Sequence, residues 1–352
     1  MEQVNISPDM LDLIQKPAFY AQEGIITRTN AAAAQILLEP GTQICKLLLT
    51  GSEEYQHFSG DELYLTLSVQ ETTWGAAVKR IGDRDVFLLE AQNAVSDLQA
   101  LSLAAQAIRE PLSTVMMVAE RLKADITKDA TDAQLNSFAR FDQSLNQILR
   151  LLGNMSDAGR FNKKAPVFTE TCNIRSFIAE LAECAGELVA STGRRLEYTG
   201  PEKDIYCLAN PELLERAFYN LLSNAIKFSP ENAQIRISLA RERKKLYLTV
   251  ENPIEKHSSI DFFTGYRREP GITDGTHGIG LGMIMIRSAA TAHGGTVLVQ
   301  LGETVKVTLS MEITNRKSTT LASNILKVDY AGQWDHRMLE LSDALPFEAF
   351  RK

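Results

Sequence analysis

The chain has few cysteines, no extended basic stretch and no long hydrophobic segment. Only four of its 352 residues are cysteine, and no two of them have the C-x-x-C spacing of zinc or redox sites. A disulfide framework is therefore not expected, and isolated thiols are typical of a reducing compartment. Acidic residues outnumber basic ones by 44 to 37, which gives a net charge of −7. A nucleic-acid partner is not expected from this balance.

Signals for export and membrane insertion are also missing. The first ten residues contain no basic region followed by an apolar core. No window approaches the ~18 consecutive apolar residues that a membrane helix needs. We therefore expect a cytoplasmic protein without a membrane span. A length of 352 residues, at ~150 residues per domain, predicts two or three domains.

Residues 1–90 alternate short apolar runs with turn signals, which predicts a small mixed α/β domain with an antiparallel sheet. The runs that resemble strands are Ile25–Asn30, Leu63–Val69, Trp74–Arg80 and Val86–Leu89, and a helical run covers Ala31–Leu38. The order of a glycine hairpin at Glu23-Gly24, then Asn30, then an alanine-rich helix resembles the start of a PAS domain. This resemblance implies a sensor domain at 1–90.

Residues 91–160 show two apolar seams with alternating spacings of three and four. The first seam contains Leu98, Leu101, Ala105, Ile108, Leu112, Val115, Ala119, Leu122 and Ile126, and the second contains Phe138, Phe141, Leu145, Ile148, Leu152 and Met155. Such spacing predicts two long helices, and the short polar break between them makes them antiparallel neighbours. A lone helical hairpin cannot cover both seams, so we expect a homodimer joined by a four-helix bundle.

Helices and strands mix between residues 165 and 313. Helices are predicted at Ile174–Ala190, Pro211–Phe228 and Leu281–His293, and strands at Ile205–Leu208, Gln234–Ala240, Leu246–Glu251, Thr296–Leu301 and Val305–Met311. The tail, residues 314–352, carries too many apolar residues for a disordered segment. We expect this tail to dock on another part of the protein.

Two motifs in this region suggest phosphate and metal chemistry. Asn220, Asn224 and Lys227 fall on one stripe of the predicted helix, where an amide oxygen suits a hard cation and an ammonium suits phosphate. The run Gly278-Ile279-Gly280-Leu281-Gly282 directly precedes a helix. Its glycines allow backbone N–H groups to surround an anion at the helix N-terminus.

Together and in this order, these two motifs resemble the N box and the second glycine box of sensor histidine kinases, which belong to the GHKL ATPase superfamily. Three further matches support the resemblance. They are Asn210-Pro211 at the start of the N-box helix, His293-Gly294-Gly295, and an aromatic F box at Phe262-Phe263 with Tyr266. The resemblance covers residues 91–311, with the sensor-like domain in front.

The resemblance implies ATP and Mg²⁺ as cofactors. Asn224 would ligate the metal with support from Asn220, and Lys227 would contact phosphate. The backbone of Gly278, Gly280, Leu281 and Gly282 would wrap the triphosphate. Asn220 stands where hydrolases of the superfamily carry a general-base glutamate, and an amide cannot accept a proton from water at neutral pH. A chaperone-like or repair-type ATPase is therefore disfavoured.

Two positions depart from the family pattern. The phosphoacceptor motif His-Glu-x-x-x-Pro-Leu corresponds to residues 106–112, and Gln106 stands where the histidine should. A glutamine amide has no basic nitrogen and cannot carry a phosphoryl group. At the adenine end, Glu251-Asn252-Pro253 replaces the family's Asp-x-Gly. Glu251 could still accept a hydrogen bond from the adenine amino group.

The sequence thus predicts a multidomain α+β protein. It comprises a PAS-like α/β sensor domain (1–90), a helical hairpin (91–160), a GHKL α/β sandwich (165–313) and a docked C-terminal tail (314–352). The favoured function is a histidine-kinase homologue that binds Mg-ATP, cannot phosphorylate its own hairpin, and signals to a response regulator or a partner histidine kinase. One alternative is a non-enzymatic interaction module. Another is a response-regulator phosphatase in which Gln106 and Glu110 orient a water.

Overall fold

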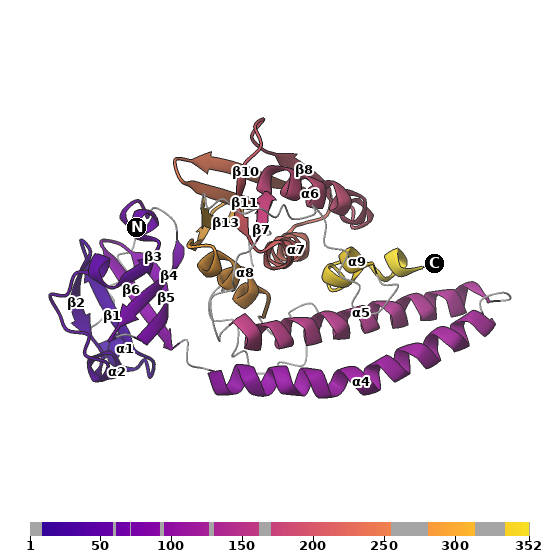
Figure 1. The fold of residues 1–352 in the computed structure, drawn as a ribbon, viewed down its shortest axis with the longest axis horizontal. Coiled ribbons are helices and arrows are strands. Elements are labelled where there is room, and N and C mark those ends of the chain that lie inside the picture. Colours follow the sequence, from indigo (N-terminus) through magenta and orange to yellow (C-terminus); the bar gives the residue numbers. More distant parts are fainter. Residues whose placement is uncertain are drawn as a thin grey trace.

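The computed structural model describes residues 9–58, 61–70, 72–91, 95–126, 130–161, 170–254, 281–313 and 335–351. Figure 1 shows three blocks: a small sheet domain at the N-terminal end, two long helices side by side, and an α/β layer structure above them. The last turns of the chain lie between the long helices and the α/β block. The predicted site residues that lie outside the described ranges are Gly278, Gly280, Phe262, Phe263 and Tyr266.

The N-terminal block is an antiparallel sheet with short helices. Its strands are β1 (Ala18–Gln22), β2 (Ile25–Thr29), β3 (Leu48–Thr50), β4 (Glu62–Val69), β5 (Thr72–Ile81) and β6 (Arg84–Ala91), and its helices are α1 (Asp9–Asp12), α2 (Ala31–Gln35), α3 (Ser52–Gln56) and the 3₁₀ turn η1 (Ile44–Lys46). Phe19 and Phe87 stack at the centre of its core, 4.5 Å apart. The Asn30 side chain caps α2 by accepting from the N–H of Ala33.

Helix α2 is shorter than the sequence predicts. The alanine-rich run suggests a helix through Leu38, but α2 ends at Gln35. Leu37 has a φ of 59°, in the left-handed region, which a right-handed helix cannot continue through. Leu38, which extended the predicted helix, is not helical but is buried in the core of the block.

The two long helices are α4 (Val95–Ile126) and α5 (Asp132–Phe161), which pack along each other. Helix α4 runs through Pro111, a residue that cannot donate a backbone hydrogen bond to the preceding turn. Within one chain the predicted seams are only half covered. Ala105, Leu145 and Leu152 are buried, whereas the exposed seam residues are Ile108, Val115, Leu122, Phe141 and Ile148.

The α/β block places three helices on one face of a sheet. The strands are β8 (Arg195–Thr199), β10 (Gln234–Glu242), β11 (Lys245–Pro253), β12 (Val297–Leu301) and β13 (Thr304–Glu312), the helices are α6 (Ile174–Ser191), α7 (Pro211–Phe228) and α8 (Leu281–Ala292), and β7 (Glu170–Asn173) pairs with β9 (Tyr206–Ala209) separately. Inward residues of the strands and helices form one core. Strand β8, which pairs in parallel with β10, is absent from the sequence prediction.

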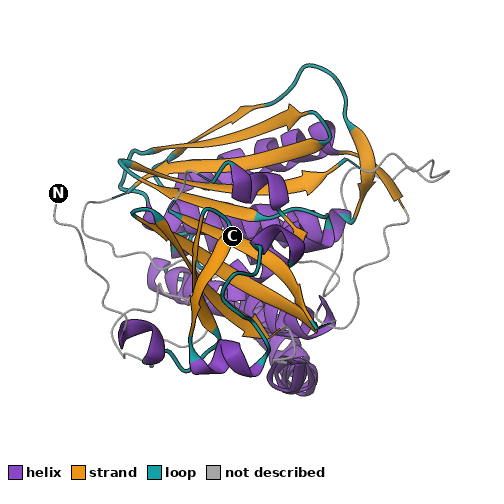
Figure 2. Cartoon of the chain, turned by 90° about the vertical axis from the view of Figure 1, so that its left-hand side faces the viewer, coloured by secondary structure: helices purple, strands orange, loops and turns teal. Residues whose placement is uncertain are grey.

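The sheets of the two blocks are joined edge to edge. Glu62, Leu63 and Tyr64 of β4 pair with Val299, Leu298 and Val297 of β12, so one sheet of eleven strands runs through both blocks (Figure 2). A side-chain contact supports this junction, because the Lys245 ammonium lies 2.6 Å from a carboxylate oxygen of Glu54. The alternation pattern alone does not indicate which strand edges pair.

Residues 335–351, here called the C-terminal segment, contain α9 (His336–Glu340) and the 3₁₀ turn η3 (Phe347–Phe350). Leu341, Leu345 and Phe350 are buried in the core of the α/β block. This part of the predicted tail therefore docks, as its apolar content suggests. In the part of the chain that the structure describes, no helix combines the length and hydropathy that crossing a membrane would require.

Candidate functional site

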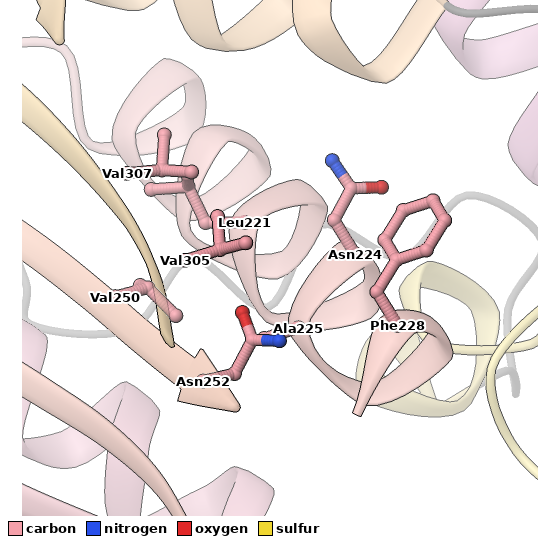
Figure 3. Close-up of a pocket in the computed structure, with 8 residues that line it drawn as sticks. All are labelled: Leu221, Asn224, Ala225, Phe228, Val250, Asn252, Val305 and Val307. Carbon is pink, nitrogen blue, oxygen red and sulfur yellow. The ribbon is translucent and has the colours of Figure 1, made fainter. Parts of the chain in front are cut away.

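A small open cavity lies between helix α7 and strands β11 and β13. Figure 3 shows the side chains that line it: Leu221, Asn224, Ala225, Phe228, Val250, Asn252, Val305 and Val307. Six of these side chains are apolar and two are amides. One amide, Asn224, comes from α7, and the other, Asn252, comes from β11 on the opposite wall. A mostly apolar pocket with a few polar groups at defined places is the usual form of a small-molecule site.

Asn224 is the amide on the helical wall. Its side-chain nitrogen donates toward the sulfur of Met283 on α8, 3.8 Å away. The orientation that this contact favours leaves the amide oxygen for other partners, and an amide oxygen is a suitable ligand for Mg²⁺. The described residues contain no cluster of three histidine, cysteine or carboxylate side chains that could hold a metal alone. A metal here would thus need ligands from a bound phosphate as well.

Asn252 is the amide on the strand wall, and sequence analysis did not select it. It is buried and shares a face of β11 with Leu246, Leu248 and Val250. Its side-chain nitrogen donates to the carbonyl of Pro253, 3.0 Å away, so its oxygen can accept a bond from a ligand. The two-residue alternation of this strand is the signal that could have identified Asn252.

Glu251 has the opposite orientation on β11. Its carboxylate accepts from the Thr304 hydroxyl at 2.9 Å and lies 3.5 Å from the Lys306 ammonium. Glu251 does not line the cavity. Because successive residues of a strand face opposite sides of the sheet, the Glu251 carboxylate, which the sequence analysis expected to accept from an adenine amino group, faces away from this cavity.

Asn220 lies behind the cavity wall and is 1% exposed. Its side-chain nitrogen donates to the Arg216 carbonyl at 2.8 Å, and its oxygen accepts from the Arg150 guanidinium at 3.1 Å. A Cβ atom added at Gly282 would lie 2.8 Å from the same oxygen. Gly282 therefore lets α8 approach α7 closely at Asn220, and Leu281 beside it is buried. With both ends of its amide bonded, Asn220 acts as a supporting residue.

Lys227 is held by the C-terminal segment. Its ammonium forms an ion pair with the Asp343 carboxylate, which also accepts from the Ser223 hydroxyl at 2.8 Å and pairs with Arg150 of α5. Burial and the neighbouring Arg150 charge lower the pKa of Lys227 to about 7. The stripe of polar residues on α7 thus divides, with Asn224 toward the cavity and Lys227 toward Asp343.

His293 is a structural residue at the base of α7. Its Nε2 accepts from the backbone N–H of Asn210 at 3.1 Å, and its Nδ1 lies 2.7 Å from the Ala289 carbonyl. These partners require a neutral ring with the proton on Nδ1. Burial lowers the pKa of His293 to about 4. Asn210 in turn caps α7 by accepting from the Leu213 N–H, so His293 fixes the start of the helix that carries Asn224.

Gln106 lies on the surface of α4, and Glu110 one turn further is also exposed. Arg109 and Ser113 line a second, open cavity, which is also lined by Arg150, Arg216 and Glu340. Gln106 is thus on the hairpin surface, about one turn from Arg109 and the second cavity.

Comparison with known proteins assigns this block to a family. Residues 209–314 match the family described as histidine kinase-, DNA gyrase B- and HSP90-like ATPases. Sensor protein KdpD of Mycobacterium tuberculosis is 25% identical over 206 residues, which are 56% of this chain and 23% of that protein. The probable sensor protein PcoS of Escherichia coli is 28% identical over 202 residues, which are 54% of this chain and 41% of that protein.

The adaptive-response sensory kinase SasA of Crocosphaera subtropica is 27% identical over 212 residues, which are 57% of this chain and 55% of that kinase. The chain thus spans between about a quarter and a half of the length of these relatives. Among solved structures, histidine kinase ShkA in complex with AMPPNP gives a TM-score of 0.49 at 19% identity, with 66% of this chain and 49% of that one covered.

A second solved structure, histidine kinase ThkA in complex with the response regulator TrrA, gives a TM-score of 0.41 at 14% identity and covers 88% of this chain and 100% of that one. Sensor kinases recur among the relatives, and the ATPase family spans the elements that build the cavity from α7 to β13. Residues 209–314 therefore form a domain of the histidine kinase-, DNA gyrase B- and HSP90-like ATPase family, and the chain is homologous to sensor histidine kinases.

Proposed function

We propose that this protein is a sensor histidine kinase homologue that binds Mg-ATP in the cavity over α7 and cannot phosphorylate its own hairpin. The observation that carries the proposal is the pair of buried or half-buried amides, Asn224 and Asn252, on opposite walls of an apolar cavity. The apolar walls suit the faces of a purine ring, and both amide oxygens can accept or coordinate.

Asn252 would recognise the base. With its nitrogen bonded to the Pro253 carbonyl, its oxygen can accept from an exocyclic amino group such as that of adenine. A guanine carbonyl at the same place would face this oxygen and be disfavoured. This assignment replaces Glu251 and accounts for base recognition without the family's aspartate.

Asn224 would hold the metal ion, which would neutralise phosphate charge when bound. Its oxygen lies at the cavity end of α7, and the Met283 contact fixes the amide orientation. Asn220 supports the same stretch of helix through Arg216 and Arg150. The backbone of Leu281 and Gly282 begins α8, where helix N–H groups favour an anion.

The hairpin would have a signalling role without phosphotransfer to itself. Gln106 is exposed, so packing does not account for its side chain, and an amide cannot be the phosphoacceptor. Exposed apolar residues along α4 and α5, such as Val115 and Ile148, favour a homodimer through these helices. The N-terminal sheet would be a PAS-like sensor, and a response regulator or a partner kinase would be the downstream protein.

A nucleotide titration with and without Mg²⁺ tests this function. We expect saturable ATP binding that depends on magnesium and is weaker for ADP. Asn224→Ala should weaken the magnesium-dependent binding by ~1–3 kcal/mol, the cost of losing a polar partner. Gln234→Ala, which removes an amide on β10 outside the cavity, is the matched control and should bind as the parent does. No saturable binding at millimolar ATP would instead favour a pure interaction module.

A further inference from the structure

The C-terminal segment fills the corner between α5 and α7. On the hairpin side, Gln143 donates to the Leu345 carbonyl at 2.7 Å, and the Arg140 guanidinium lies 3.8 Å above the Phe347 ring. On the ATPase side, the His336 ring lies 3.0 Å from a carboxylate oxygen of Glu215. Buried apolar side chains anchor the segment between these contacts. It therefore joins the hairpin to the ATPase domain.

Asp343 projects from this segment onto the face of α7 that carries Lys227. Its carboxylate contacts Lys227 and Ser223 on α7 and Arg150 on α5. Arg150 is also 3.6 Å from Glu340, so two carboxylates of the segment surround one buried guanidinium. Asp343 is the only acidic side chain shown to pair with Lys227 within the described ranges.

The Lys227 ammonium has little room for a second anion. Only 12% of its side chain is exposed, and the Asp343 carboxylate that pairs with it is itself held by the Ser223 hydroxyl and the Arg150 guanidinium. Lys227 does not line the cavity, but it follows the cavity residue Asn224 by three positions on the same helix, so the two side chains are neighbours on the helix surface. A phosphate oxygen and the Asp343 carboxylate would bind the same ammonium.

We propose that the C-terminal segment is an internal competitor of nucleotide phosphate, in which Asp343 occupies the anion position at Lys227 until a triphosphate displaces it. This inference rests on the proposed nucleotide site. It makes the docking of residues 335–351 and the binding of Mg-ATP mutually unfavourable. Because the segment also contacts α5, its release loosens the ATPase domain from the hairpin, which couples nucleotide binding to the arrangement of the two parts.

The size of the effect follows from the fraction of molecules in which Lys227 is available. Apparent affinity falls in proportion to this competent fraction, so removing the competing carboxylate raises it. Asp343→Asn keeps the size of the side chain and removes its charge. We expect this variant to bind Mg-ATP about tenfold more tightly than the parent protein, as for a competent fraction of about one tenth. Glu348→Gln makes the same change at an exposed carboxylate of the same segment and is the matched control.

The experiment measures Mg-ATP dissociation constants of the full chain and of both variants, together with hydrogen exchange of residues 335–351 at saturating Mg-ATP. Support requires tighter binding by Asp343→Asn, unchanged binding by Glu348→Gln, and faster exchange of the segment when the parent protein is saturated. Equal affinities for Asp343→Asn and the parent protein overturn the inference and leave the nucleotide site standing. Unchanged exchange in a protein saturated with nucleotide also overturns it. Absence of binding by all three proteins rejects the nucleotide site and the competition together.

Discussion

Asn252 and Val305 are direct partners in the antiparallel ladder between β11 and β13, and both side chains line the cavity over α7. The neighbouring pair, Glu251 and Lys306, lies on the other face, where the two side chains are 3.5 Å apart. One residue of register therefore decides which polar side chain lines the cavity. Under the proposed function, this residue, Asn252, is the one that would reach a bound base.

This relationship predicts a contrast between two adjacent substitutions. Asn252→Ala should weaken ATP binding by ~1–3 kcal/mol, since a buried acceptor for the base is lost. Glu251→Ala should change ATP affinity by less than ~0.5 kcal/mol, because that carboxylate makes only surface contacts with Thr304 and Lys306. Isothermal titration with ATP and with GTP measures both effects. If Glu251→Ala weakened binding and Asn252→Ala did not, the base would be bound in another way.

The chemistry at position 106 gives a second prediction. Incubation with labelled ATP should leave no acid-labile, base-stable phosphate on residues 95–126, because Gln106 has no nucleophilic nitrogen. Gln106→His restores the side chain that the family uses, at an exposed position that accepts it without repacking. We expect this variant to gain such a label if the ATPase domain is competent. Gln106→Ala is the control and should remain unlabelled, and a labelled parent hairpin would contradict this account.

The burial of the seam residues within one chain decides which substitutions test the predicted homodimer. Leu145 is already buried within one chain, so a charge there would unfold the hairpin rather than report on a partner. Val115 and Leu122 are exposed in the single chain, at 50% and 55%. Glutamate at both positions should convert a dimer to a monomer without loss of helix content, measured by sedimentation and circular dichroism. Glutamate at Thr114, beside the seam, is the control, and unchanged dimers would place the interface elsewhere.

Much of this arrangement could be predicted because its signals are local. Helix α7 begins at Pro211 and ends at Phe228 as expected, since proline is favoured in a first helical turn and the apolar period is uninterrupted. The cavity residue Asn224 follows from the same helix. A family pattern placed the predicted base recognition at Glu251, whereas strand alternation puts Asn252 on the buried face of β11.

Other features depend on contacts between segments far apart in the sequence. Asp343 lies 116 positions from Lys227, and no periodicity links them. The pairing of β4 with β12 is likewise set by which strand edges remain open, and edges carry no side-chain code of their own. The sequence indicated that the tail docks, but its place against Lys227 required the tertiary structure.

The buried ring of His293 predicts a loss of stability in mild acid. Its pKa is about 4 in the folded protein, against about 6.5 when exposed, so only the unfolded chain takes up the proton between these values. Folding stability should therefore fall as pH drops from about 6.5 to about 4, by up to ~3 kcal/mol from this group. His336 acts in the opposite sense: burial alone would lower its pKa, but Glu215 and Glu340 raise it. Its contribution is therefore present below about pH 6.5 and lost as pH rises through its folded pKa.

Urea unfolding of the parent protein and of His293→Gln, measured between about pH 6.5 and about pH 4, isolates the His293 effect because glutamine can keep both hydrogen bonds without titrating. The variant should show a shallower acid loss, whereas His57→Gln, at an exposed position, should follow the parent. Equal slopes for the parent and His293→Gln would show that the ring is already charged or solvated in the folded protein.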